Sequence, residues 1–84
     1  MTEGQTFFKN KKITVMGLGL LGRGLGVIKF LADQGVQLTV TDLKTETELK
    51  PSLIKLSQYK NIQYVLGRHR LVDFKKADLI IRAP

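Results

Sequence analysis

Three glycines and one aspartate have the types and the spacing of a site for a phosphorylated nucleotide. Gly17, Gly19 and Gly22 form a GxGxxG pattern directly behind an apolar run, and Asp42 follows a second apolar run twenty residues later. The first glycine permits a tight turn, the second lets the backbone approach a diphosphate, and the third lets a helix pack closely on a strand. The N–H groups at the helix start favour an anion, and the acid can accept hydrogen bonds from a ribose hydroxyl or a base N–H.

The polar residues near these turns also have plainer structural interpretations. Asp42 is a residue type that fills turns and caps helices, but the glycine motif upstream favours a ligand contact. Lys44 can neutralise a phosphate or be a solvated charge, and Arg23 is more typical of a solvent-facing first helical turn. His69, the only histidine, has no carboxylate or nucleophile close in sequence, which favours a loop residue bonded to the backbone over a general base. The sequence has no GxxxxGK[ST] loop, no HExxH and no cysteine, so it predicts no catalytic residue and no metal site.

Alternating strands and helices must position these residues. Apolar runs predict strands over 12–16, 37–41, 62–66 and 78–82. Apolar residues at three- and four-residue spacing predict a helix over 22–34, which Gly35 ends in the left-handed conformation. Inside this helix, Gly24 and Gly26 are expected to permit a close approach to the first strand.

Two further helical segments are expected between the later strands. Thr45 and Glu48 have the spacing of a capping box, which indicates a turn over 45–50. Pro51 suits a first helical turn better than an interior, so a helix is predicted over 51–59. Its inward residues would be Leu53, Leu56 and Tyr59. A short helical turn is predicted over 71–75.

This order of elements predicts a single small α/β domain of the Rossmann type. Right-handed crossovers give a parallel sheet ordered 3-2-1-4 with flanking helices. In such a sheet the ligand lies at the carboxyl ends of the strands, beside the switch between the first and fourth strands. That edge is formed by 17–22, 42–44, 67–70 and 83–84. The domain is expected to span 11–84, after an N-terminal extension over 1–10 whose Phe7 and Phe8 pack against the sheet edge.

Composition narrows the class of protein. The net charge is +7, from 14 Lys and Arg against 7 Asp and Glu, but the basic residues are scattered and no nucleic-acid-binding module is recognised. A small anionic ligand is therefore favoured over nucleic acid. The absence of cysteine is compatible with a reducing compartment, and neither a signal peptide nor a membrane-spanning run is found, which predicts a cytoplasmic protein without a membrane partner. Because the chain stops directly after a predicted strand, we expect a domain cut from a larger protein.

Four segments together resemble the N-terminal domain of the Mur ligases, the enzymes that build peptidoglycan precursors for the bacterial cell wall. They are ITVMGLGLLG at 13–22, VTDLK at 40–44, YVLGRH at 64–69 and ADLIIRAP at 77–84. The resemblance covers 10–84, which is the first of the family's three domains. It is nearest to the branch that adds D-glutamate, with the branch that adds L-alanine as the next alternative.

The resemblance implies a ligand and a set of contacts. In that family the glycine turn receives the diphosphate of a UDP-sugar through backbone N–H groups, which match those of Leu20 and Leu21. The family's acid at the uracil matches Asp42, and its next two residues match Leu43 and Lys44. Relatives often carry a hydroxyl residue at the positions of Leu21 and Leu43. The implied UDP-binding residues are thus Gly17, Gly19, Leu20, Leu21, Gly22, Asp42, Leu43 and Lys44.

The resemblance also implies the reaction of the parent enzyme. UDP-N-acetylmuramoyl-L-alanine would be phosphorylated on its carboxylate by ATP, with Mg, and then attacked by the amino group of D-glutamate. The domains that bind ATP, Mg and the amino acid are not in this chain. The chain alone is therefore expected to hold no cofactor and to have no ligase activity.

Two other functions remain open from the residues alone. One is the NAD-binding domain of a dehydrogenase, in which Asp42 would bind the adenosine ribose. The other is a nucleotide-sensing module without enzymatic activity. Titration with UDP ligands and NADH separates the first from a Mur ligase domain, and the gene sequence beyond Pro84 tests the second.

Overall fold

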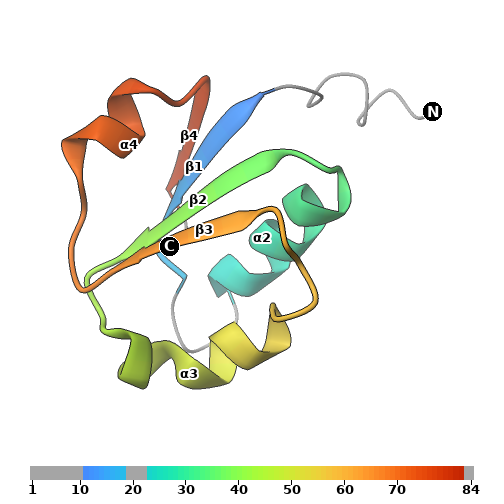
Figure 1. Cartoon of the computed structure of the whole chain (residues 1–84), viewed down its shortest axis with the longest axis vertical. Helices are drawn as coiled ribbons and strands as arrows, with labels where there is room; N and C mark the ends of the chain where they lie inside the picture. Colours follow the sequence, from blue (N-terminus) through green and yellow to red (C-terminus); the bar gives the residue numbers. More distant parts are fainter. Residues whose placement is uncertain (1–10, 19–22, 83–84) are drawn as a thin grey trace.

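Four parallel strands form one sheet, which lies between the helices (Figure 1). The structure, a computed structural model, describes residues 11–18 and 23–82. The strands are β1 (Lys12–Met16), β2 (Gln37–Asp42), β3 (Ile62–Leu66) and β4 (Leu79–Arg82). Their order in the sheet is β3-β2-β1-β4, and each neighbouring pair is parallel. The predicted Rossmann-like fold and its strand order are confirmed.

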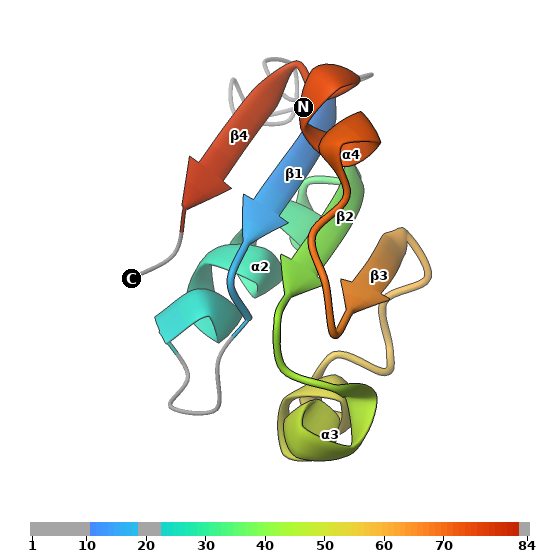
Figure 2. The ribbon, with the colours of Figure 1, turned by 90° about the vertical axis from the view of Figure 1, so that its left-hand side faces the viewer.

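Helices cover the two faces of the sheet unequally. They are α2 (Arg23–Asp33), α3 (Glu46–Lys55) and the short α4 (Leu71–Lys75). Figures 1 and 2 show α2 and α3 on one side of the sheet and α4 on the other. This is what right-handed crossovers require, because the chain moves outward from β1 to β3 and then returns across the sheet to β4.

The hydrophobic core lies between the sheet and the two longer helices. Successive residues of a strand point to opposite faces, so Ile13 and Val15 enter this core while Thr14 faces α4. The Thr14 hydroxyl donates to the carbonyl oxygen of Asp73 at 2.7 Å, which holds α4 on β1. The core side chains on the helices and on β2 include Leu25, Ile28, Leu31, Leu38, Val40, Leu49 and Leu56.

The predicted boundaries of α3 are wrong. The helix begins at Glu46 and ends at Lys55, instead of spanning 51–59. The capping box of Thr45 and Glu48 is the helix start itself, and not part of a separate turn. Pro51 therefore lies inside the helix, at an exposed position, and it cannot donate the usual helical hydrogen bond to the carbonyl oxygen of Thr47, which is also an exposed residue.

The same shift changes which residues of this segment face inward. Leu56 is fully buried as predicted, and Leu53 and Tyr59 are partly buried against the core. Leu49, which was not predicted to be helical, is also fully buried. An earlier helix start brings this residue onto the inner face, one turn before Leu53.

The other boundaries match the predictions, as for β1 and β3, or differ from them by single residues. β2 extends to Asp42, and β4 begins at Leu79 because the Asp78 side chain instead accepts a hydrogen bond from the Lys12 N–H at 2.8 Å. Helix α2 ends at Asp33, and Gly35 follows with a φ of 77°, as expected of a helix stop. The short helix over 71–75 is confirmed.

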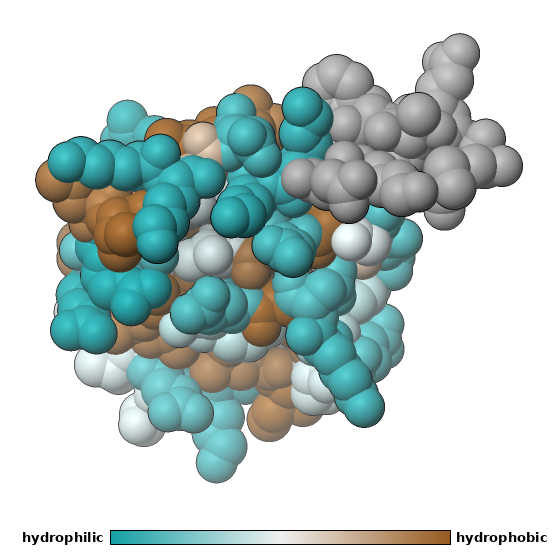
Figure 3. Space-filling model, turned by 45° about the horizontal axis from the view of Figure 1, so that its top comes forward, coloured by the Kyte–Doolittle hydropathy of each residue, from teal (hydrophilic) through white to brown (hydrophobic). Residues whose placement is uncertain are grey.

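The face turned forward in Figure 3 mixes hydrophilic side chains with smaller hydrophobic areas, without one continuous apolar patch. This pattern agrees with a chain in which a quarter of the residues are charged. The predicted packing of Phe7 and Phe8 against the sheet edge lies outside the described residues.

Candidate functional site

The glycine turn leaves the sheet at the end of β1, where the arrowheads of the strands lie along one edge (Figure 2). Gly17 has a φ of 102°, a conformation that favours glycine, and its N–H donates to the carbonyl oxygen of Thr41 at 2.7 Å. The positive φ that a tight turn needs is therefore present at the first glycine. The positions of Gly19, Leu20, Leu21 and Gly22 lie outside the described residues, and their contacts with a ligand stay predictions.

Helix α2 packs directly on the backbone of this turn at Gly24. A Cβ built on Gly24 would lie 2.5 Å from the carbonyl oxygen of Gly17 and 2.6 Å from that of Leu18. Only glycine fits such an approach, so the expected close contact is present at this position, but it is made with the two residues after β1 and not with the strand itself. The prediction is wrong for Gly26, which has open space where its Cβ would stand. The two glycines lie two residues apart on a helix and so point in different directions.

Asp42 lies between the glycine turn and the turn that follows β2. Its side chain is almost fully buried, with 7% of the residue exposed. One carboxylate oxygen, Oδ2, accepts a hydrogen bond from the Leu18 N–H at 2.9 Å. The other, Oδ1, accepts from the Lys44 N–H at 2.8 Å. The turn-forming role of this residue type is thus present, while its predicted contact with a ligand remains a prediction.

The loop after β3 joins the same arrangement through its backbone. Gly67, with a φ of 79°, donates its N–H to the carbonyl oxygen of Lys44 at 2.8 Å. The Arg68 N–H donates to the carbonyl oxygen of Asp42 at 3.2 Å, in an isolated antiparallel bridge. The three loops that follow β1, β2 and β3 are therefore connected around Asp42. The sequence predicts that these loops lie at one edge, but no local pattern in it shows how they are joined.

His69 belongs to the loop after β3, as its position in the sequence indicated. Its Nδ1 and the Thr41 hydroxyl share a hydrogen bond of 2.8 Å, and its ring meets Phe74 edge-on with centroids 6.1 Å apart. The partner is thus a side chain and not the backbone that was expected. The ring ties the loop to the buried end of β2, which is a structural role.

Exposed and charged side chains surround this edge. Leu43 is 68% exposed, and Lys44 and Arg68 are exposed as well. Further from the turn, Arg70 binds Asp73 through two hydrogen bonds of 2.8 and 2.9 Å, and this guanidinium holds the pKa of the Asp73 carboxyl below its usual value. Lys44 and Arg68 can therefore attract an anionic ligand, while the exposed Glu46 and Glu48 follow Lys44 in the chain.

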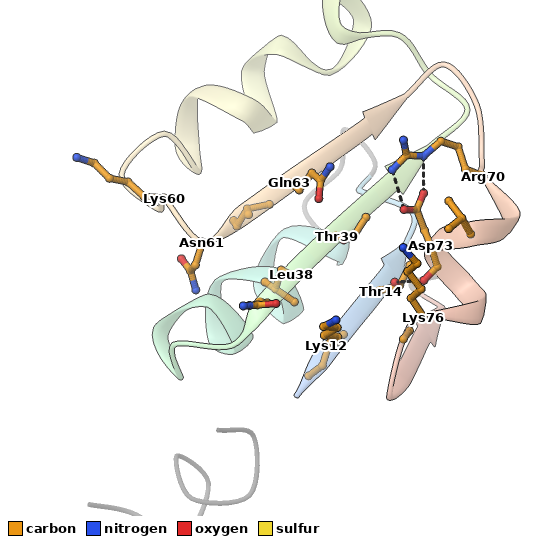
Figure 4. Close-up of a pocket in the computed structure, with 15 residues that line it drawn as sticks. Lys12, Thr14, Leu38, Thr39, Lys60, Asn61, Gln63, Arg70, Asp73 and Lys76 are labelled. Carbon is orange, nitrogen blue, oxygen red and sulfur yellow. Dashed lines mark hydrogen bonds and ion pairs between the residues drawn. The ribbon is translucent and has the colours of Figure 1, made fainter. Parts of the chain in front are cut away.

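The sheet also has a hollow on its other face, away from the glycine turn. Figure 4 shows this pocket beside α4, with a volume of about 590 Å³. It is lined by the first residues of the strands and by α4, and neither Gly17 nor Asp42 reaches it. Ligands of doubly wound sheets bind at the carboxyl ends of strands, so the edge around Asp42 is the better candidate.

Neither a metal-binding cluster nor a membrane-spanning helix occurs in the part of the chain that the structure describes. Within 11–18 and 23–82, no group of three or more His, Cys, Asp or Glu side chains could hold a metal ion. Searched over the same residues, no helix is long and apolar enough to cross a bilayer. What the described edge offers to an anion is the positive charge of two exposed side chains, Lys44 and Arg68.

Several curated proteins that are similar to this chain share one name. A protein of Treponema pallidum (strain Nichols) called UDP-N-acetylmuramoylalanine–D-glutamate ligase is 42% identical over 84 residues, all of this chain and 16% of that protein. Proteins with the same name are 46% identical over 77 residues in Borreliella burgdorferi (strain ZS7), covering 90% of this chain and 17% of that protein, and 47% identical over 74 residues in Roseiflexus sp. (strain RS-1), covering 88% and 16%.

The chain spans about one-sixth of the length of these relatives. A family model described as "Mur ligase MurD-like, N-terminal domain" matches residues 11–84. This match takes in all four strands and the loops joined around Asp42. The chain therefore belongs to the family of MurD-like Mur ligase N-terminal domains.

Proposed function

We propose that this chain is the substrate-binding domain of a UDP-N-acetylmuramoylalanine–D-glutamate ligase. Its site would hold the UDP end of UDP-N-acetylmuramoyl-L-alanine at the carboxyl ends of β1, β2 and β3. The observation that carries this proposal is the positive-φ glycine turn at Gly17, joined through Asp42 to the loops after β2 and β3. The names of the relatives supply the identity of the nucleotide-sugar.

Each part of the edge has a role in this proposal. The diphosphate would meet the N–H groups of Leu20 and Leu21, because N–H groups at a helix start attract anions. The uracil would lie beside Asp42 and Leu43, whose side chain is 68% exposed and offers an apolar surface to a flat base. Lys44 is exposed next to it and would offset the negative charge of the phosphates.

The bond-forming chemistry would belong to the rest of the ligase. Phosphate transfer from ATP to the alanine carboxylate gives an acyl phosphate, and attack by the D-glutamate amino group forms the amide and releases phosphate. Among the described residues no cluster suits a Mg ion, so this chain's part is to bind and orient the substrate. We place the parent in the cytoplasm, where ATP is available and a chain without cysteine is suited to the reducing conditions.

Amide chemical shifts of the labelled chain test this function. Titration with UDP and with UDP-N-acetylmuramoyl-L-alanine is expected to move the amide signals of Leu18, Leu20, Leu21 and Asp42, while NADH leaves them in place. The ligase substrate should bind at least as tightly as UDP, because it contains the same nucleotide. Shifts at these amides with NADH and none with the uridine ligands would favour a dehydrogenase domain and contradict the proposal.

Two exposed lysines provide a matched pair for this titration. Lys44 lies at the proposed site, whereas Lys60 lines the hollow on the other face of the sheet. Lys44→Ala is expected to weaken UDP binding several-fold, and Lys60→Ala to leave it unchanged. Because both variants lose one positive charge, an equal effect of the two would mean that only the net charge of the chain attracts the nucleotide.

A further inference from the structure

The carboxylate of Asp42 points into the protein, toward two backbone N–H groups. It receives the Leu18 N–H at 2.9 Å and the Lys44 N–H at 2.8 Å, while the carbonyl oxygen of the same residue receives the Arg68 N–H at 3.2 Å. One residue with 7% exposure thus contacts all three loops of the proposed site. A side chain that served only to meet a ligand would have no need of these inward bonds.

We propose that Asp42 is a positioning residue for the diphosphate of the substrate. Its carboxylate fixes the backbone at Leu18, where the glycine turn begins, relative to the turn after β2. The distance between the diphosphate-binding turn and the loop beside the base is then set by one buried charge. This inference rests on the proposed function, and it adds that Asp42 acts on the phosphates through the turn.

The physical strength of this link comes from charge and burial. Hydrogen bonds to an ionised carboxylate are shorter and stronger than neutral ones, and here one carboxylate accepts two of them away from water. Loss of the acceptor leaves buried N–H groups without a partner, which favours movement of the turn.

Leu18 is also held from the opposite side. It is fully buried, and its carbonyl oxygen lies against Gly24, where a Cβ would come within 2.6 Å. The entrance to the glycine turn is therefore fixed between the Asp42 carboxylate and the first residues of α2. If either side moves, Leu18 moves with it, and this changes where the chain enters the segment that is proposed to hold the diphosphate.

Positioning and direct contact predict different losses when Asp42 is changed. If the residue fixes the turn, changing it lowers the affinity for every ligand that contains a diphosphate, whatever base that ligand carries. A residue that only touches the uracil or the ribose affects ligands that carry uridine, and leaves inorganic pyrophosphate unaffected. The affinity ratio between variant and original chain therefore distinguishes the two roles.

The experiment compares the original chain with Asp42→Asn by NMR titration with UDP, uridine and inorganic pyrophosphate. Asparagine has nearly the same shape, but its NH₂ group cannot accept a hydrogen bond, so one N–H loses its partner. We expect similar losses of about tenfold for UDP and pyrophosphate, and little change for uridine. We also expect faster hydrogen exchange at the Leu18 amide in the free variant.

Asp73→Asn is the matched control. Asp73 also has a poorly exposed carboxylate, at 8%, with two hydrogen bonds, but its partner is Arg70 and it lies on α4. This variant is expected to lose some stability and to keep the affinities for UDP and pyrophosphate. If it weakens ligand binding as much as Asp42→Asn does, general destabilisation explains the effect and the inference is wrong.

The remaining outcomes separate this inference from the proposed function. An original chain that binds neither UDP nor pyrophosphate contradicts both. An original chain that binds UDP but not pyrophosphate, or an Asp42→Asn variant that keeps its pyrophosphate affinity, overturns the positioning role alone. If Asp42→Asn does not fold, Gly24→Ala moves Leu18 from its other side with Asp42 intact. A matching loss for UDP and pyrophosphate then supports the inference, and unchanged affinities overturn it.

Discussion

At the scale of the residue, two glycines shape the backbone where the chain enters the candidate site. Gly17 turns the chain out of β1, and Gly24 lets the next helix lie on the carbonyl groups of Gly17 and Leu18. Glycine is favoured by the positive φ at position 17 and by the space that the neighbours leave at position 24. Substitutions that add only one methyl group are therefore informative.

Gly24 and Gly26 form a matched pair for such a substitution, because both lie in α2. Gly24→Ala is expected to lower the free energy of unfolding by about 1–3 kcal/mol, since its Cβ would meet backbone oxygens that have little room to move. Gly26→Ala is expected to raise it by about 1 kcal/mol, because alanine favours the helix and the position is open. Urea unfolding measures both, and a stabilising Gly24→Ala would contradict the close approach.

The start of α3 shows what decides the limits of an element. The Thr45 hydroxyl accepts the Glu48 N–H at 3.3 Å, and the Glu48 carboxylate accepts the Thr45 N–H at 3.0 Å. These bonds satisfy the first N–H groups of the helix and allow Pro51 to lie inside it. The hydrogen bonds from Thr45 lower the pKa of Glu48 below its ordinary value of 4.5.

Thr45→Ala is expected to lower the free energy of unfolding by about 1 kcal/mol, because it removes the N-cap of α3. Thr47→Ala, an exposed change two residues later, should stay within about 0.5 kcal/mol. The pKa of Glu48 should rise in Thr45→Ala, as one of its hydrogen bonds is lost. Because the pKa of Glu48 is lowered in the folded state, its ionised carboxylate stabilises the fold above pH 4.5, and this stabilisation is lost as the pH falls below that value. The loss of stability caused by Thr45→Ala should therefore be smaller in acid. Urea unfolding at neutral and acidic pH, with NMR titration of Glu48, checks these expectations.

At the scale of the whole molecule, binding and reaction are expected to be separable. The chain spans about one-sixth of its relatives, and its described residues contain no group that could hold Mg. The isolated chain should therefore bind UDP but form no amide from UDP-N-acetylmuramoyl-L-alanine, ATP and D-glutamate. Phosphate release and mass spectrometry measure the reaction, with the complete ligase from a relative as the positive control. Product formation by the isolated chain would contradict this division.

The sequence by itself determined the sheet and its strand order, and it placed the residues of the predicted binding site along one edge of that sheet. Apolar runs and glycine positions are local signals, and right-handed crossovers leave few topologies for them. It also determined the close approach at Gly24, although the same reasoning failed for Gly26 because the direction of each helix face was not known. Sequence patterns placed Asp42 at the tip of β2 for the same local reasons.

Only the tertiary structure decided what these residues contact. That the Asp42 carboxylate reaches Leu18, twenty-four residues earlier, depends on how β1 and β2 pair and how far each turn bends. The bond between His69 and Thr41 depends in the same way on the path of the loop after β3. Such contacts join segments that are distant in the chain, so no local pattern encodes them. They arise when the sheet brings the three loops to one edge.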